Sequence, residues 1–109
     1  MYDKDENRAV FEKGELTLEI VKEKSPFMFP ENRLKLAWLI RREGFYVRMH
    51  GYEYLVSHGG RFLCLILLQP MNRIVMIRVF NWIENSHRLV GRIIELIKSL
   101  DNVSEIVVY

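Results

Sequence analysis

The sequence has a single cysteine, Cys64, so no disulfide can form within the chain. It has no apolar segment that approaches the roughly 20 residues needed to span a bilayer. Residues 1–6 are polar and charged, unlike the apolar stretch of a secretory signal. These absences predict a cytoplasmic protein with no membrane partner.

Proline and glycine are scarce, at three and six residues, and we find no internal repeat, low-complexity tract or linker. A length of 109 residues supports one hydrophobic core but not two. We therefore predict a single domain over residues 1–109, with residues 1–7 frayed. Glutamine and threonine are rare, whereas arginine, glutamate, isoleucine and valine are plentiful, which is typical of proteins from thermophiles.

Charge of neither sign dominates, because 16 lysine and arginine residues oppose 14 aspartate and glutamate residues, for a formal net charge of +2. So small a net charge does not by itself indicate a nucleic-acid or membrane partner. Arginine is the commoner basic residue, however, and most arginines lie in or beside the expected helices and strands.

The most informative feature that is present is the unbroken apolar run over residues 62–68. Because side chains alternate between the two faces of a strand, a strand with this sequence has no polar face to turn toward water. Gly59 and Gly60 before the run and Pro70 after it favour a strand over a buried helix. We predict that residues 62–68 form the centre of a sheet covered on both faces, with Cys64 as an inert core thiol.

The remaining pattern predicts an α+β fold with a mainly antiparallel mixed sheet, in the order β-β-α-β-β-β-β-α-β, and two helices packed on the sheet. The expected strands cover residues 8–11, 15–22, 45–49, 52–56, 61–68, 73–80 and 103–109, and the expected helices cover 30–43 and 83–100. Within 15–22, Leu16, Leu18 and Ile20 alternate with polar residues. This strand is therefore expected at or near an edge of the sheet.

The two helices can be arranged in two ways. The first carries a wide apolar stripe, made of Leu34, Leu36, Ala37, Trp38, Leu39 and Ile40. Helices on opposite faces of the sheet would cover residues 62–68 within one chain. Helices on the same face would leave an apolar face for a second copy of the chain, which predicts a homodimer.

One segment of the sequence, with the elements that follow it, resembles a known family. A helix that ends in Arg41-Arg42-Glu43-Gly44-Phe45-Tyr46-Val47, followed by a hairpin, a central strand, a helix and a final strand, is similar to the nuclease-like core of archaeal tRNA splicing endonucleases. It resembles archaeal Holliday-junction resolvases more distantly. The similarity covers about residues 31–109, and it implies a nuclease-like fold and an archaeal source.

The catalytic residues of those families are not matched. Metal-dependent nucleases of that kind require one acidic residue, then a glutamate and a lysine two residues apart on the next strand, to hold Mg²⁺ and orient water. Glu53 could be the first of these residues. The following strand, at residues 65–68, offers neither a carboxylate nor a lysine.

The splicing-type reaction requires a tyrosine, a histidine and a lysine as base, acid and electrostatic stabiliser. Residues of these types are present but not at that family's spacing: Tyr52 or Tyr54, His58 or His87, and Lys98. His50 and His58 could also converge on a metal, but such a site needs a third and a fourth ligand. Two polar loop histidines are the simpler interpretation, and we expect no metal site and no cofactor.

Arginines interleaved with aromatic residues favour a nucleic-acid surface, because guanidinium groups bind phosphate in a fork and aromatic rings stack on bases. The candidates are Arg48, Arg61, Arg73, Arg78, Tyr46, Tyr52, Tyr54 and Phe62. The alternative is that these arginines face solvent and are balanced by nearby glutamates. If Trp82 and residues 27–29 are exposed, they would instead favour docking of a protein.

The leading hypothesis is a small, non-catalytic, homodimeric α+β protein that binds nucleic acid or a component of a nucleic-acid machine. One alternative is a nuclease-like enzyme with an unorthodox site around Tyr52, Glu53, His58 and Lys98. The other alternative is a purely structural assembly protein.

Overall fold

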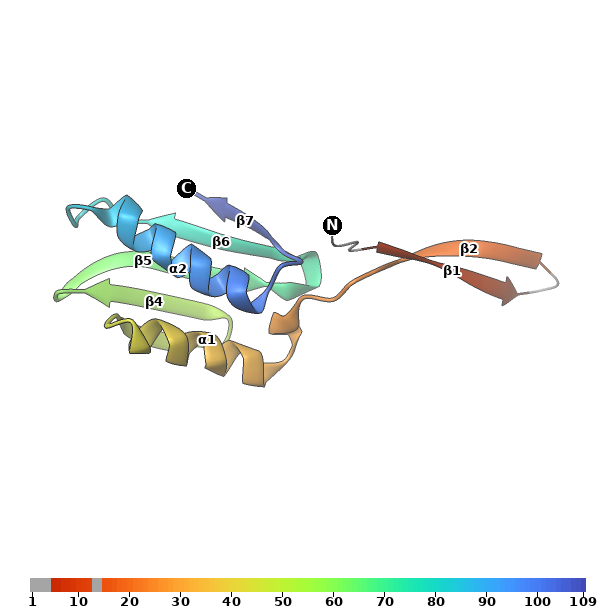
Figure 1. Cartoon of the computed structure of the whole chain (residues 1–109), viewed down its shortest axis with the longest axis horizontal. Helices are drawn as coiled ribbons and strands as arrows, with labels where there is room; N and C mark the ends of the chain where they lie inside the picture. The colour runs from red at the N-terminus through yellow and green to blue at the C-terminus, as the bar shows by residue number, and fades with distance from the viewer. Residues whose placement is uncertain (1–4, 13–14) are drawn as a thin grey trace.

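The computed structural model of the protein describes residues 5–12 and 15–109 (Figure 1). The strands of this part are β1 (Asp5–Glu12), β2 (Glu15–Lys22), β3 (Tyr46–His50), β4 (Glu53–His58), β5 (Arg61–Gln69), β6 (Ile74–Val79) and β7 (Glu105–Val108). The α-helices are α1 (Pro30–Arg42) and α2 (Ser86–Leu100), and the short 3-10 helices are η1 (Pro26–Met28) and η2 (Pro70–Asn72). This order confirms the predicted α+β fold.

The larger sheet has its strands in the order β3-β4-β5-β6-β7. Neighbouring strands are antiparallel except for β6 and β7, which are parallel and connected through α2. β5 therefore occupies the middle of the sheet, as the apolar run over residues 62–68 predicts.

The N-terminal strands form a separate hairpin, because β1 and β2 pair antiparallel with each other in a two-stranded sheet. The prediction that residues 15–22 lie near an edge of the main sheet is therefore wrong, since β3 and β7 are its edges. Residues 5–7, which are predicted to be frayed, belong to β1, and their fraying stays a prediction. Residues 1–4 lie outside the described residues.

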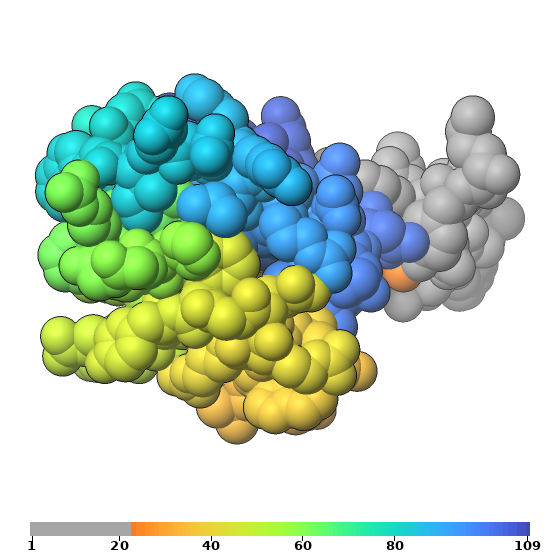
Figure 2. Space-filling view, turned by 60° about the vertical axis from the view of Figure 1, so that its left-hand side comes forward, coloured from red at the N-terminus to blue at the C-terminus, as the bar shows by residue number. Residues whose placement is uncertain are grey.

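Both α-helices cover the same face of the five-stranded sheet, and they lie side by side on it (Figures 1 and 2). Their buried residues join a single core cluster with one face of the sheet, which includes Leu36, Ala37 and Ile40 from α1, Val90, Ile93 and Ile97 from α2, and Val47, Tyr54, Val56, Ile66, Leu68, Val75 and Ile77 from the strands. The arrangement with helices on opposite faces is therefore wrong. The helices of the described residues therefore cover the central strand on one face only.

A β-bulge explains part of the unbroken apolar run in β5. The register between β4 and β5 shifts at Val56 and Ser57, so that Ser57 pairs with Phe62 and Val56 pairs with Cys64. Leu63 is the extra residue of the bulge, and both Leu63 and Cys64 are buried. Cys64 is thus the core thiol that the sequence predicts, and burial raises the pKa of this thiol to about 12.

The helices differ from the prediction in two details. α2 begins at Ser86 rather than at residue 83, because Asn85 has a left-handed backbone with a φ of 65°, which cannot continue a right-handed helix. The apolar stripe of α1 is wider than its buried surface. Leu34 and Trp38 are exposed, and the guanidinium of Arg42 lies 4.7 Å from the centroid of the Trp38 ring.

A buried carboxylate ties the segment after β2 to the turn before β7. Asp101 directly follows α2, and one of its oxygens accepts hydrogen bonds from the hydroxyls of Ser25 and Ser104, at 2.8 and 2.6 Å. The other oxygen accepts from the backbone N–H groups of Val103 and Ser104, at 2.8 and 2.9 Å. Because Ser25 and Asp101 are both buried, this network fixes the point where the N-terminal hairpin leaves the core.

Replacing Ser25 with alanine removes one hydrogen bond to this buried carboxylate. We expect Ser25→Ala to lower the free energy of unfolding by about 1–3 kcal/mol, measured by urea denaturation. The control is Ser99→Ala, because Ser99 is exposed and its hydroxyl donates only to the Leu96 carbonyl of its own helix. The control should change stability by less than about 0.5 kcal/mol. Equal losses in the two variants would contradict the role of the network.

Candidate nucleic-acid interface

The face of the sheet opposite α1 and α2, which we call the open face, carries no helix of the described residues. Paired residues of neighbouring strands share a face, so the strand register identifies the side chains on it. Across the sheet, Arg48 pairs with Leu55, Leu55 with Leu65, and Leu65 with Arg78. This row therefore has leucines in the middle and an arginine on each side.

The middle of the open face is apolar. In the next row, Glu53 pairs with Leu67, Leu67 with Met76, and Met76 with Val107. We call the apolar members of these two rows, together with Ile74, the apolar band: Leu55, Leu65, Leu67, Ile74, Met76 and Val107. All six are half-buried or exposed, so each of them presents apolar surface to water.

Aromatic rings gather at the end of the open face where β5 begins. Tyr46 and Phe62 both pair with Ser57, so they lie on the same face. The rings of Phe62 and Trp82 are 6.4 Å apart between centroids, and Trp82 stacks on Phe80 at 5.0 Å with an interplanar angle of 17°. Tyr46, Phe62 and Trp82 are 64%, 45% and 59% exposed. We call Tyr46, Phe62, Phe80 and Trp82 the aromatic end.

Three of the four arginines that the sequence predicts for a nucleic-acid surface lie at or beside this end. Arg48 and Arg78 are exposed on the open face, one row away from the aromatic end. Arg61 is exposed as well, and its guanidinium donates a hydrogen bond to the carbonyl of Trp82 at 3.1 Å. The guanidinium of Arg78 lies 5.2 Å from the ring centroid of Tyr109.

Arg73 is the exception among the four arginines. It follows η2 at the opposite end of β5 and β6, with a left-handed φ of 54°. Its carbonyl accepts a hydrogen bond from the backbone N–H of Glu105 at 2.9 Å, which joins the start of β7 to the sheet. Arg73 is therefore separated from the aromatic end by the length of the strands.

The two tyrosines predicted for the same surface have different positions. Tyr54 is fully buried in the core, its hydroxyl donates to the carbonyl of Arg33 at 2.7 Å, and burial raises its pKa. The prediction that Tyr54 contacts nucleic acid is therefore wrong, because no base can reach its ring in the folded protein. Tyr52 is exposed in the turn between β3 and β4, and the guanidinium of Arg33 lies 4.4 Å from its ring centroid.

The residues predicted for an unorthodox catalytic site are not brought together. Tyr52 and Glu53 lie at the start of β4, and Glu53 is on the open face. His58 ends the same strand, about 17 Å away along six residues. Lys98 is exposed on α2, in the helical layer on the other side of the sheet. In this arrangement the four side chains cannot act on one substrate atom.

The histidines are separated in the same way. His50 pairs with Glu53, whereas the ring of His58 lies 5.4 Å from the ring of Phe45 at the other end of β4. Among the described residues, no three His, Cys, Asp or Glu side chains are grouped so that they could hold a metal ion. None of the helices in residues 5–12 and 15–109 is long and apolar enough to cross a membrane.

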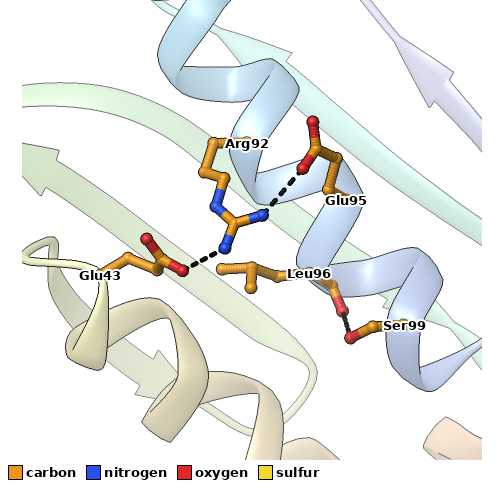
Figure 3. A network of polar contacts seen from close by, with 5 residues as sticks. All are labelled: Glu43, Arg92, Glu95, Leu96 and Ser99. Atoms are coloured by element: carbon orange, nitrogen blue, oxygen red, sulfur yellow. Dashed lines mark hydrogen bonds and ion pairs between the residues drawn. The ribbon is translucent and has the colours of Figure 1, made fainter.

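A groove opens where the end of α1 meets the start of α2, and it is lined by Glu43, Phe45, His58, Ile83, Glu84, Asn85, Arg88, Leu89 and Arg92. Arg92 links the two helices, because its guanidinium donates hydrogen bonds to Glu43 and, at 2.8 Å, to Glu95 (Figure 3). The hydrogen bond from Arg92 holds the pKa of Glu43 below its usual value. Since two carboxylates oppose two guanidinium groups in this groove, its charge does not favour an anionic ligand.

Comparisons with known proteins give no match, whether with family models, with curated proteins or with solved structures. The resemblance of residues 31–109 to nuclease-like cores stays a prediction.

The ion pair of Glu43 with Arg92 predicts that the difference in stability between the unmodified chain and Glu43→Gln depends on pH. Because the folded-state pKa of Glu43 is lowered, the ion pair contributes to the free energy of unfolding at neutral pH. This contribution is lost as the pH falls through the lowered pKa. We expect Glu43→Gln to lower the melting temperature at pH 7, and the difference from the unmodified chain to shrink toward zero in acid. Thermal unfolding followed by circular dichroism at neutral and acidic pH measures it. A difference of constant size across that range would contradict the assignment.

Proposed function

We propose that this protein is a non-catalytic binding protein for single-stranded nucleic acid, and that it contacts its ligand through the aromatic end of the open face. The observation that supports this most directly is the exposed ring of Trp82, which stacks on the half-buried Phe80 and lies beside the exposed Phe62. The guanidinium of Arg61 donates a hydrogen bond to the Trp82 carbonyl. Aromatic rings stack on unpaired bases of any sequence, and guanidinium groups pair with the phosphates between them.

The spacing of the rings supports a single strand rather than a duplex. Tyr46 and Phe62 are separated by one intervening strand, β4, and two strand spacings amount to roughly 10 Å. Bases that are paired within a duplex do not present their faces to such a surface, whereas the bases of an extended single strand do.

The distribution of charge supports the same ligand. Residues 23–109 contain twelve lysine and arginine residues and eight aspartate and glutamate residues, for a formal charge of +4. Residues 1–22 contain four basic and six acidic residues, for a formal charge of −2. The small net charge of the whole chain thus conceals a basic sheet-and-helix body, and Arg48 and Arg78 place part of that positive charge on the open face.

We propose binding rather than cleavage because Glu53, His58 and Lys98 lie far apart, while Phe62, Trp82 and the guanidinium of Arg61 are grouped at one end of the sheet. A nuclease-like enzyme would need its acidic, histidine and lysine side chains to meet at one reacting phosphate.

Binding is tested by fluorescence anisotropy with a labelled single-stranded oligonucleotide at about 50 mM salt, where phosphate contacts are strong. We expect Trp82→Ala to weaken binding by about tenfold, because a stacked base contributes on the order of 1–3 kcal/mol. Trp38→Ala is the matched control, since Trp38 is 56% exposed on α1, in the helical layer. Equal weakening in the two variants, or no binding by the unmodified chain at low salt, would refute the proposal.

Arg78 on the open face predicts a separate effect, on the salt dependence of nucleic-acid binding. Arg78→Ala should weaken binding and should reduce the slope of affinity against salt concentration by about one counterion, because one phosphate contact is lost. Arg73→Ala serves as the control with the same change of charge, since Arg73 lies at the far end of the strands. A salt slope that does not change in Arg78→Ala would mean that this side chain does not meet a phosphate.

A further inference from the structure

The apolar band of the open face suits a different binding partner from the aromatic end. Leu55, Leu65 and Leu67 are half-buried at the middle of the sheet, with no helix of the described residues above them. Leucine side chains supply neither a stacking surface nor a hydrogen bond, so they suit an apolar protein surface rather than a nucleic acid. We propose that this band is covered by the β1–β2 hairpin of a second copy of the chain, so that two chains exchange hairpins.

The hairpin itself requires a partner. β1 and β2 pair only with each other among the described strands, and a two-stranded hairpin alone is at best marginally stable in water. In the sequence of β2, Leu16, Leu18 and Ile20 alternate with polar residues, which is the pattern of a strand with one apolar face. Two apolar sheet surfaces that pack face to face are both removed from water.

Charge complementarity favours this pairing. The segment that contains the hairpin, residues 1–22, has a formal charge of −2, whereas residues 23–109 have a formal charge of +4. Arg48 flanks the apolar band at one edge of the sheet. An acidic hairpin lying across the band would place opposite charges at the rim of an apolar contact, which favours the correct pairing of the two surfaces.

The tether of the hairpin favours a second copy over the same chain. Ser25 is fixed in the core by Asp101, so that only Glu23 and Lys24 separate the end of β2 from a fixed point. The three Cα–Cα steps from Lys22 to Ser25 span at most about 11 Å, so the hairpin starts beside the point where Ser25 is fixed. From there the hairpin extends away from its own sheet along the longest axis of the molecule, which measures 63 Å against 23 and 20 Å for the others (Figure 1). Reciprocal exchange between two such chains closes a twofold dimer.

Disulfide trapping tests the contact with full-length chains. Two single variants, Leu18→Cys in the hairpin and Leu67→Cys in the band, are mixed and oxidised; Cys64 does not interfere, because it is fully buried with its pKa raised to about 12. We expect a covalent heterodimer of the two variants. A mixture of Leu18→Cys with Lys98→Cys, whose second site is exposed on α2, should give none. An intramolecular disulfide in a monomeric Leu18→Cys/Leu67→Cys chain would show that the hairpin covers its own sheet, and would overturn the exchange.

Light scattering supplies the second measurement. The unmodified chain should have twice the chain mass of 13.1 kDa, and Leu67→Glu should raise the dimer dissociation constant by about tenfold or more, since it places a charge in an apolar contact. Leu34→Glu is the control, because Leu34 is exposed on α1. Circular dichroism establishes that both variants are folded. A monomeric unmodified chain, or a dimer that Leu67→Glu leaves intact, would overturn the proposal, whereas Trp82→Ala should not affect the dimer.

Discussion

Both α-helices bury their apolar stripes against one face of a five-stranded sheet, and the other properties of this protein follow from that one-sided cover. The helices and the inner face share a core of aliphatic side chains in which Ile66 and Ile77 are completely buried. The outer face of the same strands then has to present Leu65 and Leu67 to its surroundings. Since burial of apolar surface is the main favourable term in folding and association, an uncovered apolar face is the strongest sign of a binding surface that the structure contains.

The open face has two regions that differ in the chemistry of their side chains. Its aromatic end combines exposed rings with Arg61, which suits an unpaired nucleic acid, and its middle is aliphatic, which suits a protein surface. The two regions are adjacent but carry different side chains, so one can be changed without the other. A ligand at the aromatic end and a second chain over the apolar band are therefore compatible.

The order of elements could be predicted because each element carries a local signal. Pro30 begins α1, Gly44 follows it, Pro70 separates β5 from β6, and the apolar run over residues 62–68 marks the middle strand. The side of the sheet that each helix covers could not be predicted, because that run is equally apolar on both faces. The two strands of a hairpin pair with each other whether or not the hairpin joins a larger sheet, so nothing in the local sequence distinguishes the two cases.

The same distinction applies to individual side chains, because the local sequence pattern predicts the positions of some of them and not of others. The burial of Tyr54 could have been predicted, since it alternates with Glu53 and shares a face with Val56. The position of Phe80 also follows from alternation, two residues after Arg78. The exposure of Trp38 could not be predicted, because α1 has more apolar residues than its contact with the sheet can bury.

Helical cover on one face of the sheet alone is tested by methyl NMR of the Leu67→Glu variant with a soluble paramagnetic probe, at a concentration where light scattering gives a monomer. The methyl signals of Leu55 and Leu65 should be broadened by the probe, while those of Ile66 and Ile77 should not, although all four lie on neighbouring strands. Equal protection of all four side chains in this monomer would mean that a single chain covers both faces of the sheet, which is the opposite of a one-sided cover.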